Sequence, residues 1–143
     1  GLTTTFYTCC AEAYPNLFVI SDPDEATWLG WFAQADNYDG FLRWAYNSWT
    51  LDPLADARFR TWPAGDCFVV YPGGRGSVHF SKLTEGIQDF EKVRILRAQW
   101  RKEGNAQKLN RLSELLKAFS TETILAEGPA NALIAAKTFL DQQ

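Results

Sequence analysis

The stretch SDPDEATWLGWFAQADNYDGFLRWAY, residues 21–46, decides the predicted fold, because it holds a complete helix and the strand that follows it. Ser21, Asp22 and Pro23 supply an N-cap and a first-turn proline. Apolar residues recur behind them at helical spacing until the polar turn 37–40. The apolar run 41–46 is typical of a buried strand.

The same alternation continues on both sides of this stretch. Upstream, residues 2–10 (LTTTFYTCC) are β-branched and aromatic and predict a strand. Downstream, a long connection at 47–65 leads to a third predicted strand at 66–71 (DCFVVY) and a glycine-rich turn at 72–76. Apolar residues from Leu83 to Trp100 then recur every three or four positions, which indicates a long amphipathic helix. This order predicts an α/β fold with about three parallel strands.

The last part of the chain has a helical pattern only. Gly104 and Asn105 break the long helix, and further helices are expected near 109–119 and 129–140. We therefore expect βα units over residues 1–103 and a helical tail over 104–143 that packs on them.

Charge and composition exclude several classes of partner. The net charge of -3 disfavours nucleic acid, and we interpret the basic residues Arg94, Arg97, Arg101 and Lys102 as a solvated helix face. No apolar run reaches the roughly 18 to 20 residues that span a membrane. Six Trp, five Tyr and ten Phe give more ring surface than a small core needs, so part of it is expected to face a ligand.

Cofactor and metal sites have no support in the sequence. The cysteines, Cys9, Cys10 and Cys67, are expected to be buried free thiols, because neighbours on a strand point to opposite faces. His79 is the single histidine and is expected to be structural. No spacing typical of a zinc site is present, so we expect no cofactor.

The candidate site is a sugar-binding surface at the exit of the strand in GFLRWAYNSW, residues 40–49. A buried arginine must be paired or face a polar cavity. Flat rings beside amide and hydroxyl groups suit sugars, because one face of a pyranose carries C–H bonds while its hydroxyls need directed hydrogen bonds. The alternative is that the tryptophans are core residues. The predicted sugar-contacting residues are Arg43, Trp44, Tyr46, Asn47, Trp49, Trp62 and Tyr71.

No acidic residue is predicted to be catalytic. The start of a helix fully explains Asp24 and Glu25, and Asp89 and Glu91 are interpreted as a solvated helix face. Asp66 is expected at the strand end away from the site, where a capping or turn role is as plausible as sugar binding.

The phrases LRWAYNSW, WPAGD, VYPG and EGIQDFE, in this order between Gly40 and Leu96, resemble the C-terminal part of the glycoside hydrolase family 123 catalytic domain. The phrase WLGW at 28–31 extends the resemblance upstream. It implies the last strands of a (β/α)8 barrel of the TIM type and β-N-acetylgalactosaminidase activity assisted by the substrate's acetamido group. The family's catalytic Asp-Glu pair lies upstream of the matched region, so this chain is expected to be inactive by itself.

The resemblance also implies a carbohydrate partner (an amino-sugar glycan) and contact with the rest of the barrel in a longer parent chain. Because an incomplete barrel exposes strand edges, we also expect self-association through those edges. An extracellular or periplasmic location is implied as well. A non-catalytic carbohydrate-binding or scaffold domain is the alternative function, and a helical interaction module built from the tail is a third.

Overall fold

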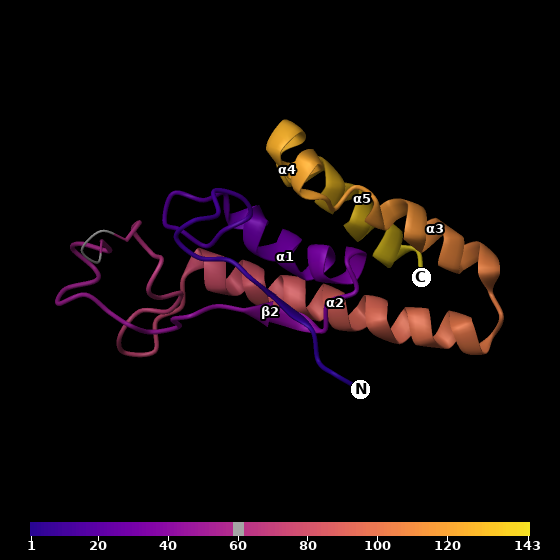
Figure 1. Cartoon of the computed structure of the whole chain (residues 1–143), viewed down its shortest axis with the longest axis horizontal. Coiled ribbons are helices and arrows are strands. Elements are labelled where there is room, and N and C mark those ends of the chain that lie inside the picture. The colour runs from indigo at the N-terminus through magenta and orange to yellow at the C-terminus, as the bar shows by residue number, and fades with distance from the viewer. Residues whose placement is uncertain (59–61) are drawn as a thin grey trace.

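A computed structural model describes residues 1–58 and 62–143 and shows a mixed α/β fold that is mostly helical. Strand β1 (Thr5–Tyr7) and strand β2 (Gly40–Leu42) form a two-stranded parallel sheet in which Thr5 pairs with Gly40. Helix α1 (Pro23–Ala35) connects them. The long loops after β2 extend from one end of the molecule, beyond the helices (Figure 1). The predicted parallel pairing is confirmed for these two strands.

Helix α1 begins and ends where the sequence predicts. The Asp22 side chain accepts a hydrogen bond from the Asp24 backbone N–H (3.0 Å), and the Glu25 side chain accepts one from the Asp22 backbone N–H (3.0 Å), which completes a capping box. After the helix, Asn37 has a positive φ of 57°, a conformation that asparagine tolerates better than most residues. Local chemistry therefore fixes both ends of this helix.

The strands are shorter and fewer than predicted. The runs 2–10 and 41–46 contribute only three residues each to the sheet. The prediction of a strand at 66–71 is wrong, because this run pairs with the preceding loop through an isolated antiparallel bridge between Asn47 and Phe68. A β-prone run becomes a strand only where a neighbour pairs with it, and pairing is not visible in local sequence. The statement of three parallel strands is thus corrected to two in the described chain.

Helix α2 (Val78–Lys102) confirms the predicted long helix and packs along α1. Ser77 caps its start by accepting a hydrogen bond from the Phe80 backbone N–H (2.9 Å). The two helices are in close contact at Gly30 and Gly86, where a Cβ on either residue would meet the other helix's backbone. Thr27 donates a hydrogen bond to the Lys82 carbonyl (3.0 Å) beside this crossing. Glycine is therefore required here for close packing of the backbones.

Three further helices cover α1 and α2: α3 (Ala106–Leu116), α4 (Thr121–Glu127) and α5 (Ala130–Asp141). Helices α3 and α5 match the predicted tail, whereas α4 was not predicted. Trp31 stacks on Phe119 with ring centroids 5.2 Å apart, and Trp28 and Trp100 are buried in the same core. Much of the ring surface is thus used in the core between the helices. Among the described residues, no helix has the length and apolar character needed to cross a membrane.

The interpretation of Asp89 as a solvated residue is wrong. Asp89 is 8% exposed. Its Oδ2 accepts a hydrogen bond from the Trp31 indole N–H (3.0 Å) and also forms an ion pair with Lys137 Nζ (2.6 Å). Helices α1 and α5 both reach this side of α2, which its helical pattern alone does not reveal. Asp89 is therefore a buried link among three helices.

Lys137 also pairs with Glu85 (2.7 Å), and this contact predicts a pH dependence of stability. The hydrogen bond from Lys137 lowers the pKa of Glu85 below its ordinary 4.5. A carboxyl with a lowered folded-state pKa contributes stability that is present above its unfolded pKa and is lost as pH falls through the folded value. We expect the thermal midpoint to drop as pH falls from neutral to below 4.5, with a shallower drop in Glu85→Gln.

Circular-dichroism melting at a series of pH values checks this expectation. The control is Glu114→Gln, which removes a carboxyl from an exposed ion pair with Lys117 on α3. Equal slopes for Glu85→Gln and the unsubstituted chain would contradict it.

Candidate functional site

The carboxyl ends of β1 and β2 meet at one edge of the sheet because the strands are parallel. The residues after β1 and the segment that starts with Arg43 after β2 both emerge there. Helix α1 starts on this side too, since it runs back from the exit of β1 to the entry of β2. Ligands of parallel sheets bind at this edge, so the edge is where the candidate site is expected.

Alternation of side chains after β2 separates a buried row from an exposed row. Arg43 and Ala45 point inward: the Arg43 side chain is 6% exposed and Ala45 is buried. Trp44 and Tyr46 point outward and are exposed by 46% and 53%. This period of two is the strand pattern carried past the last paired residue. It places the charge inside and the rings outside.

Arg43 is held in a polar network through both of its terminal nitrogens, while its Nε has no hydrogen-bond partner among the described residues. Its Nη2 donates to Asp66 Oδ1 (3.0 Å), and its Nη1 donates to Asn16 Oδ1 (2.8 Å) and to the Thr8 carbonyl (3.2 Å). Burial raises the pKa of Asp66 and lowers the pKa of Arg43, while the attraction between the two charges opposes both changes. The expectation that a buried arginine must be paired is confirmed. Arg43 therefore orders the loops of the site.

Trp44 and Trp62 form a pair of exposed rings above this network. Their ring centroids are 6.0 Å apart at an interplanar angle of 60°, and Trp62 is 39% exposed. The Trp44 indole N–H donates to Asp66 Oδ2 (3.1 Å), so the carboxylate that pairs with Arg43 also fixes this ring. We call Trp44 and Trp62 the ring pair. It offers two apolar faces at a fixed angle to solvent.

The other predicted contact residues lie along the loops rather than in the ring pair. Tyr46 packs edge-on against Phe80 (centroids 5.9 Å apart), and Asn47 forms the bridge to Phe68. The Trp49 indole N–H donates to the Val70 carbonyl (2.7 Å). Tyr71 packs against Phe68 (5.3 Å) at the start of the tight turn that its N–H closes with Arg75. Each of these side chains has its own local anchor, and their contact with sugar stays a prediction.

The prediction that Asp66 lies at the end of the sheet away from the site is wrong, because Asp66 pairs with Arg43 just after β2. Without a strand at 66–71, the loop folds back and brings Asp66, which is fully buried, under the ring pair. Asn16 was also missed. It connects the site to α1, because its backbone N–H donates to Glu25 Oε2 (2.8 Å) while its side chain accepts from Arg43. The signal available in the sequence was Arg43 itself, whose burial demanded a carboxylate partner.

Two carboxylates near the site, those of Glu25 and Asp66, have structural roles. Glu25 is buried and accepts hydrogen bonds from the backbone N–H groups of Asp22 and Asn16, as a helix-start residue should. Asp66 is fully buried beneath Trp44. In the described part of the chain, no group of three or more histidine, cysteine or carboxylate side chains has a geometry that could hold a metal ion.

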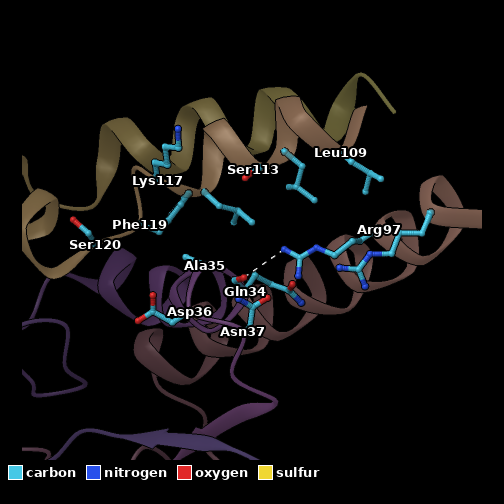
Figure 2. A pocket seen from close by; sticks show the side chains of 13 residues that line it. Gln34, Ala35, Asp36, Asn37, Arg97, Leu109, Ser113, Lys117, Phe119 and Ser120 are labelled. Carbon is cyan, nitrogen blue, oxygen red and sulfur yellow. Dashed lines mark hydrogen bonds between the residues drawn. The ribbon is translucent and has the colours of Figure 1, made fainter. Parts of the chain in front are cut away.

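A cavity of about 450 Å³ lies at the C-terminal end of α1, far from the ring pair, and helices α2 and α3 form its other walls (Figure 2). Arg97 donates a hydrogen bond across the cavity to the Gln34 carbonyl (3.4 Å) and is partly buried. The prediction that Arg97 belongs to a solvated helix face is therefore wrong. Arg101 and Lys117 line the same cavity. The aromatic residue that lines this cavity, Phe119, is buried in the core. This cavity therefore lacks the exposed rings that stack on a sugar.

Comparisons with known proteins agree on one relationship. The family model described as glycoside hydrolase 123, catalytic domain, matches residues 1–96. A solved structure from Clostridium perfringens, described as a family 123 glycoside hydrolase studied for glycolipid glycan hydrolysis, is 27% identical with a TM-score of 0.77. The match covers 99% of this chain and 28% of that one, so this chain spans less than a third of its length. No curated protein matches this chain.

Proposed function

Because the chain belongs to the glycoside hydrolase family 123 catalytic domain, we propose that it forms a sugar-binding wall in the hydrolysis of β-N-acetylgalactosaminides. The observation that supports this most directly is the ring pair, Trp44 and Trp62, exposed at the carboxyl edge of the parallel strands. Two indole faces at a fixed angle can stack on the C–H face of a pyranose and leave its hydroxyls free for hydrogen bonds.

The Arg43–Asp66 network has a positioning role in this proposal. Both side chains are buried, so they do not present charge to the sugar. Asp66 instead holds the Trp44 indole N–H, which keeps the ring from rotating when no ligand is bound. A ring already held in its binding position loses less conformational entropy on binding, which favours affinity.

The wider architecture is part of the same proposal. We place the two described strands in the last part of a (β/α)8 barrel, with residues 1–103 as its βα units and 104–143 as a helical cover. The match of the family model to residues 1–96 supports that division. The remaining strands would come from the rest of a longer chain, or strand edges would pair between copies.

Catalysis in this proposal depends on carboxyl groups supplied outside the described site. A hydrolase that uses its substrate's acetamido group needs one carboxylate to orient that group and one acid to protonate the leaving oxygen. Asp66 and Glu25 are both buried and engaged by backbone or indole donors, so neither can reach a bound sugar. The chain would therefore bind one side of the sugar while the proton transfers occur on the other.

A non-catalytic carbohydrate-binding domain is the second candidate function. It is favoured by the burial of Asp66, the carboxylate directly beneath the ring pair. Such a domain would hold the sugar on the exposed rings and release it unchanged.

Hydrolysis of an aryl β-N-acetylgalactosaminide separates the two candidates. We would assay this chain alone and, beside it, a longer chain that carries any sequence its gene encodes before Gly1. Activity in the longer chain with binding alone in the shorter one supports the glycosidase. Binding by both without hydrolysis supports the second candidate, and no binding by either overturns both.

Substitution of the ring pair tests the sugar wall directly. We expect Trp44→Ala and Trp62→Ala each to weaken binding of N-acetylgalactosamine by about tenfold or more, since aromatic anchors often contribute 2 kcal/mol or more to binding. Titration calorimetry gives the affinities. The control is Leu51→Ala, which removes a fully exposed apolar side chain elsewhere on the loops. Wild-type affinity in both tryptophan variants would contradict the assignment.

A further inference from the structure

The turn after β1 brings two neighbouring thiols together. Cys9 Sγ and Cys10 Sγ lie 3.5 Å apart, and both residues are partly exposed. Side chains of adjacent strand residues point to opposite faces, so this approach requires that the strand end at Tyr7 and the chain turn. The expectation that all three cysteines are buried is therefore wrong for this pair and right for Cys67.

The surroundings of the pair favour reaction at Cys9. Interaction with the nearby Tyr7 hydroxyl lowers the pKa of the Cys9 thiol, and the same interaction raises the pKa of Tyr7 to about 12. Thiolate that is accessible to solvent is the reactive form of cysteine. Burial raises the pKa of Cys67, which makes that thiol a poor nucleophile.

A bond between these sulfurs would be easily reversed. The Cα atoms of neighbouring residues are about 3.8 Å apart, which is shorter than the roughly 4.4–6.8 Å found across most disulfides. The resulting strain makes such a bond easier to reduce than a structural disulfide. The geometry thus suits a bond that forms and breaks rather than a permanent crosslink.

We propose that Cys9 and Cys10 are a reversible redox-modification site. Their oxidation by a low-molecular-weight disulfide changes the conformation of the loops beneath the ring pair. The Cys9 thiolate attacks one sulfur of the oxidant and releases its first thiol. The Cys10 thiolate then attacks Cys9 Sγ, forms the Cys9–Cys10 bond and releases the second thiol. The oxidant gains two electrons, and the protons of the two cysteines end on the two released thiols.

The backbone of this turn connects the pair to the site. The Cys9 carbonyl accepts a hydrogen bond from Asn16 Nδ2 (2.6 Å), and the neighbouring Thr8 carbonyl accepts one from Arg43 (3.2 Å). Closing a ring through adjacent residues changes the backbone dihedrals at both cysteines. Asn16 and Arg43 must then shift their contacts, and Asp66 and Trp44 follow Arg43. The redox chemistry proposed for Cys9 and Cys10 does not depend on the proposed function. Only its expected effect on sugar binding rests on that function.

Intact-mass spectrometry of the full chain with oxidised glutathione tests the chemistry. We expect the chain to lose two hydrogen atoms without gaining glutathione, the Cys9–Cys10 peptide to carry the bond, and dithiothreitol to reverse the change. Cys10→Ser should stop at a stable glutathione adduct on Cys9, whereas Cys67→Ser should behave like the unsubstituted chain. No reaction, a lasting adduct on the unsubstituted chain, or a disulfide-linked dimer overturns the proposal.

Nuclear magnetic resonance tests the connection to the site without using sugar. The Trp44 indole N–H resonance, assigned through Trp44→Phe, should move on oxidation and return on reduction. An unmoved resonance in a chain that mass spectrometry shows to be oxidised overturns the coupling. With N-acetylgalactosamine, we expect oxidation to change affinity by threefold or more. No sugar binding in either redox form counts against the proposed function and leaves the mass and resonance results to decide the redox site.

Discussion

Replacing Asp66 by asparagine is expected to reduce the free energy of unfolding by about 3–5 kcal/mol, because it leaves the buried Arg43 guanidinium without its counter-charge. The side chains of this pair are 6% and 0% exposed, so water cannot replace the lost partner. A typical domain of this size has only about 5–15 kcal/mol in total. The substitution is thus expected to bring the chain close to unfolding at room temperature.

Denaturant unfolding followed by tryptophan fluorescence measures this loss. The matched control is Asp56→Asn, which breaks the ion pair with Arg58 on the surface, where side chains are 74% and 52% exposed, and should change stability little. The double variant Arg43→Met, Asp66→Asn should recover part of the loss, because no unpaired charge remains. Equal stability of Asp66→Asn and Asp56→Asn would contradict the role assigned to the pair.

Gly30→Ala is expected to have the second large effect, a loss of about 2 kcal/mol or more. A Cβ at Gly30 overlaps the carbonyl group of Gly86, and a Cβ at Gly86 would lie 2.7 Å from the Thr27 carbonyl oxygen. Overpacking against backbone costs about 1–3 kcal/mol and sometimes more. The better helix propensity of alanine offsets about 1 kcal/mol at most. Helices α1 and α2 must move apart, and the core around Trp31 loosens with them.

Thermal and denaturant unfolding check this expectation, with Gly76→Ala as the control. Gly76 has no atom within 4 Å of the position of an added Cβ, so alanine there meets open space. A Gly30→Ala chain as stable as Gly76→Ala would show that the two helices do not need their close crossing.

The helices could be predicted from sequence because their signals are local. The N-cap at Asp22 and the break at Gly104 each depend on residues within one turn. Helix α4 was missed because seven residues hold too few apolar positions to show a period. Strand lengths could not be predicted, since a strand ends where its partner does. The apolar run at 66–71 has β propensity, but in the described part of the chain its backbone pairing with the preceding loop is the isolated bridge between Asn47 and Phe68.

The site was predictable in part. The exposed rings near the exit of β2 follow from the segment around Trp44, and the need to pair Arg43 follows from its place in an apolar run. Its partner did not follow, because Asp66 lies 23 residues away across a long connection. The meeting of Trp44 with Trp62 depends on the same folding back of the loop. Residue type thus indicated the chemistry, and only tertiary structure showed which residues carry it together.

One consequence of the capping box at the start of α1 extends to the indoles. Glu25 holds Asn16, Asn16 holds Arg43, and through Asp66 the guanidinium steadies Trp44. Fraying of the first helical turn would release Asn16 and let the tryptophan swing away. Opening of that turn and loss of the ring geometry are therefore a single local unfolding event, and the indoles keep their spacing only while the helix start stays wound.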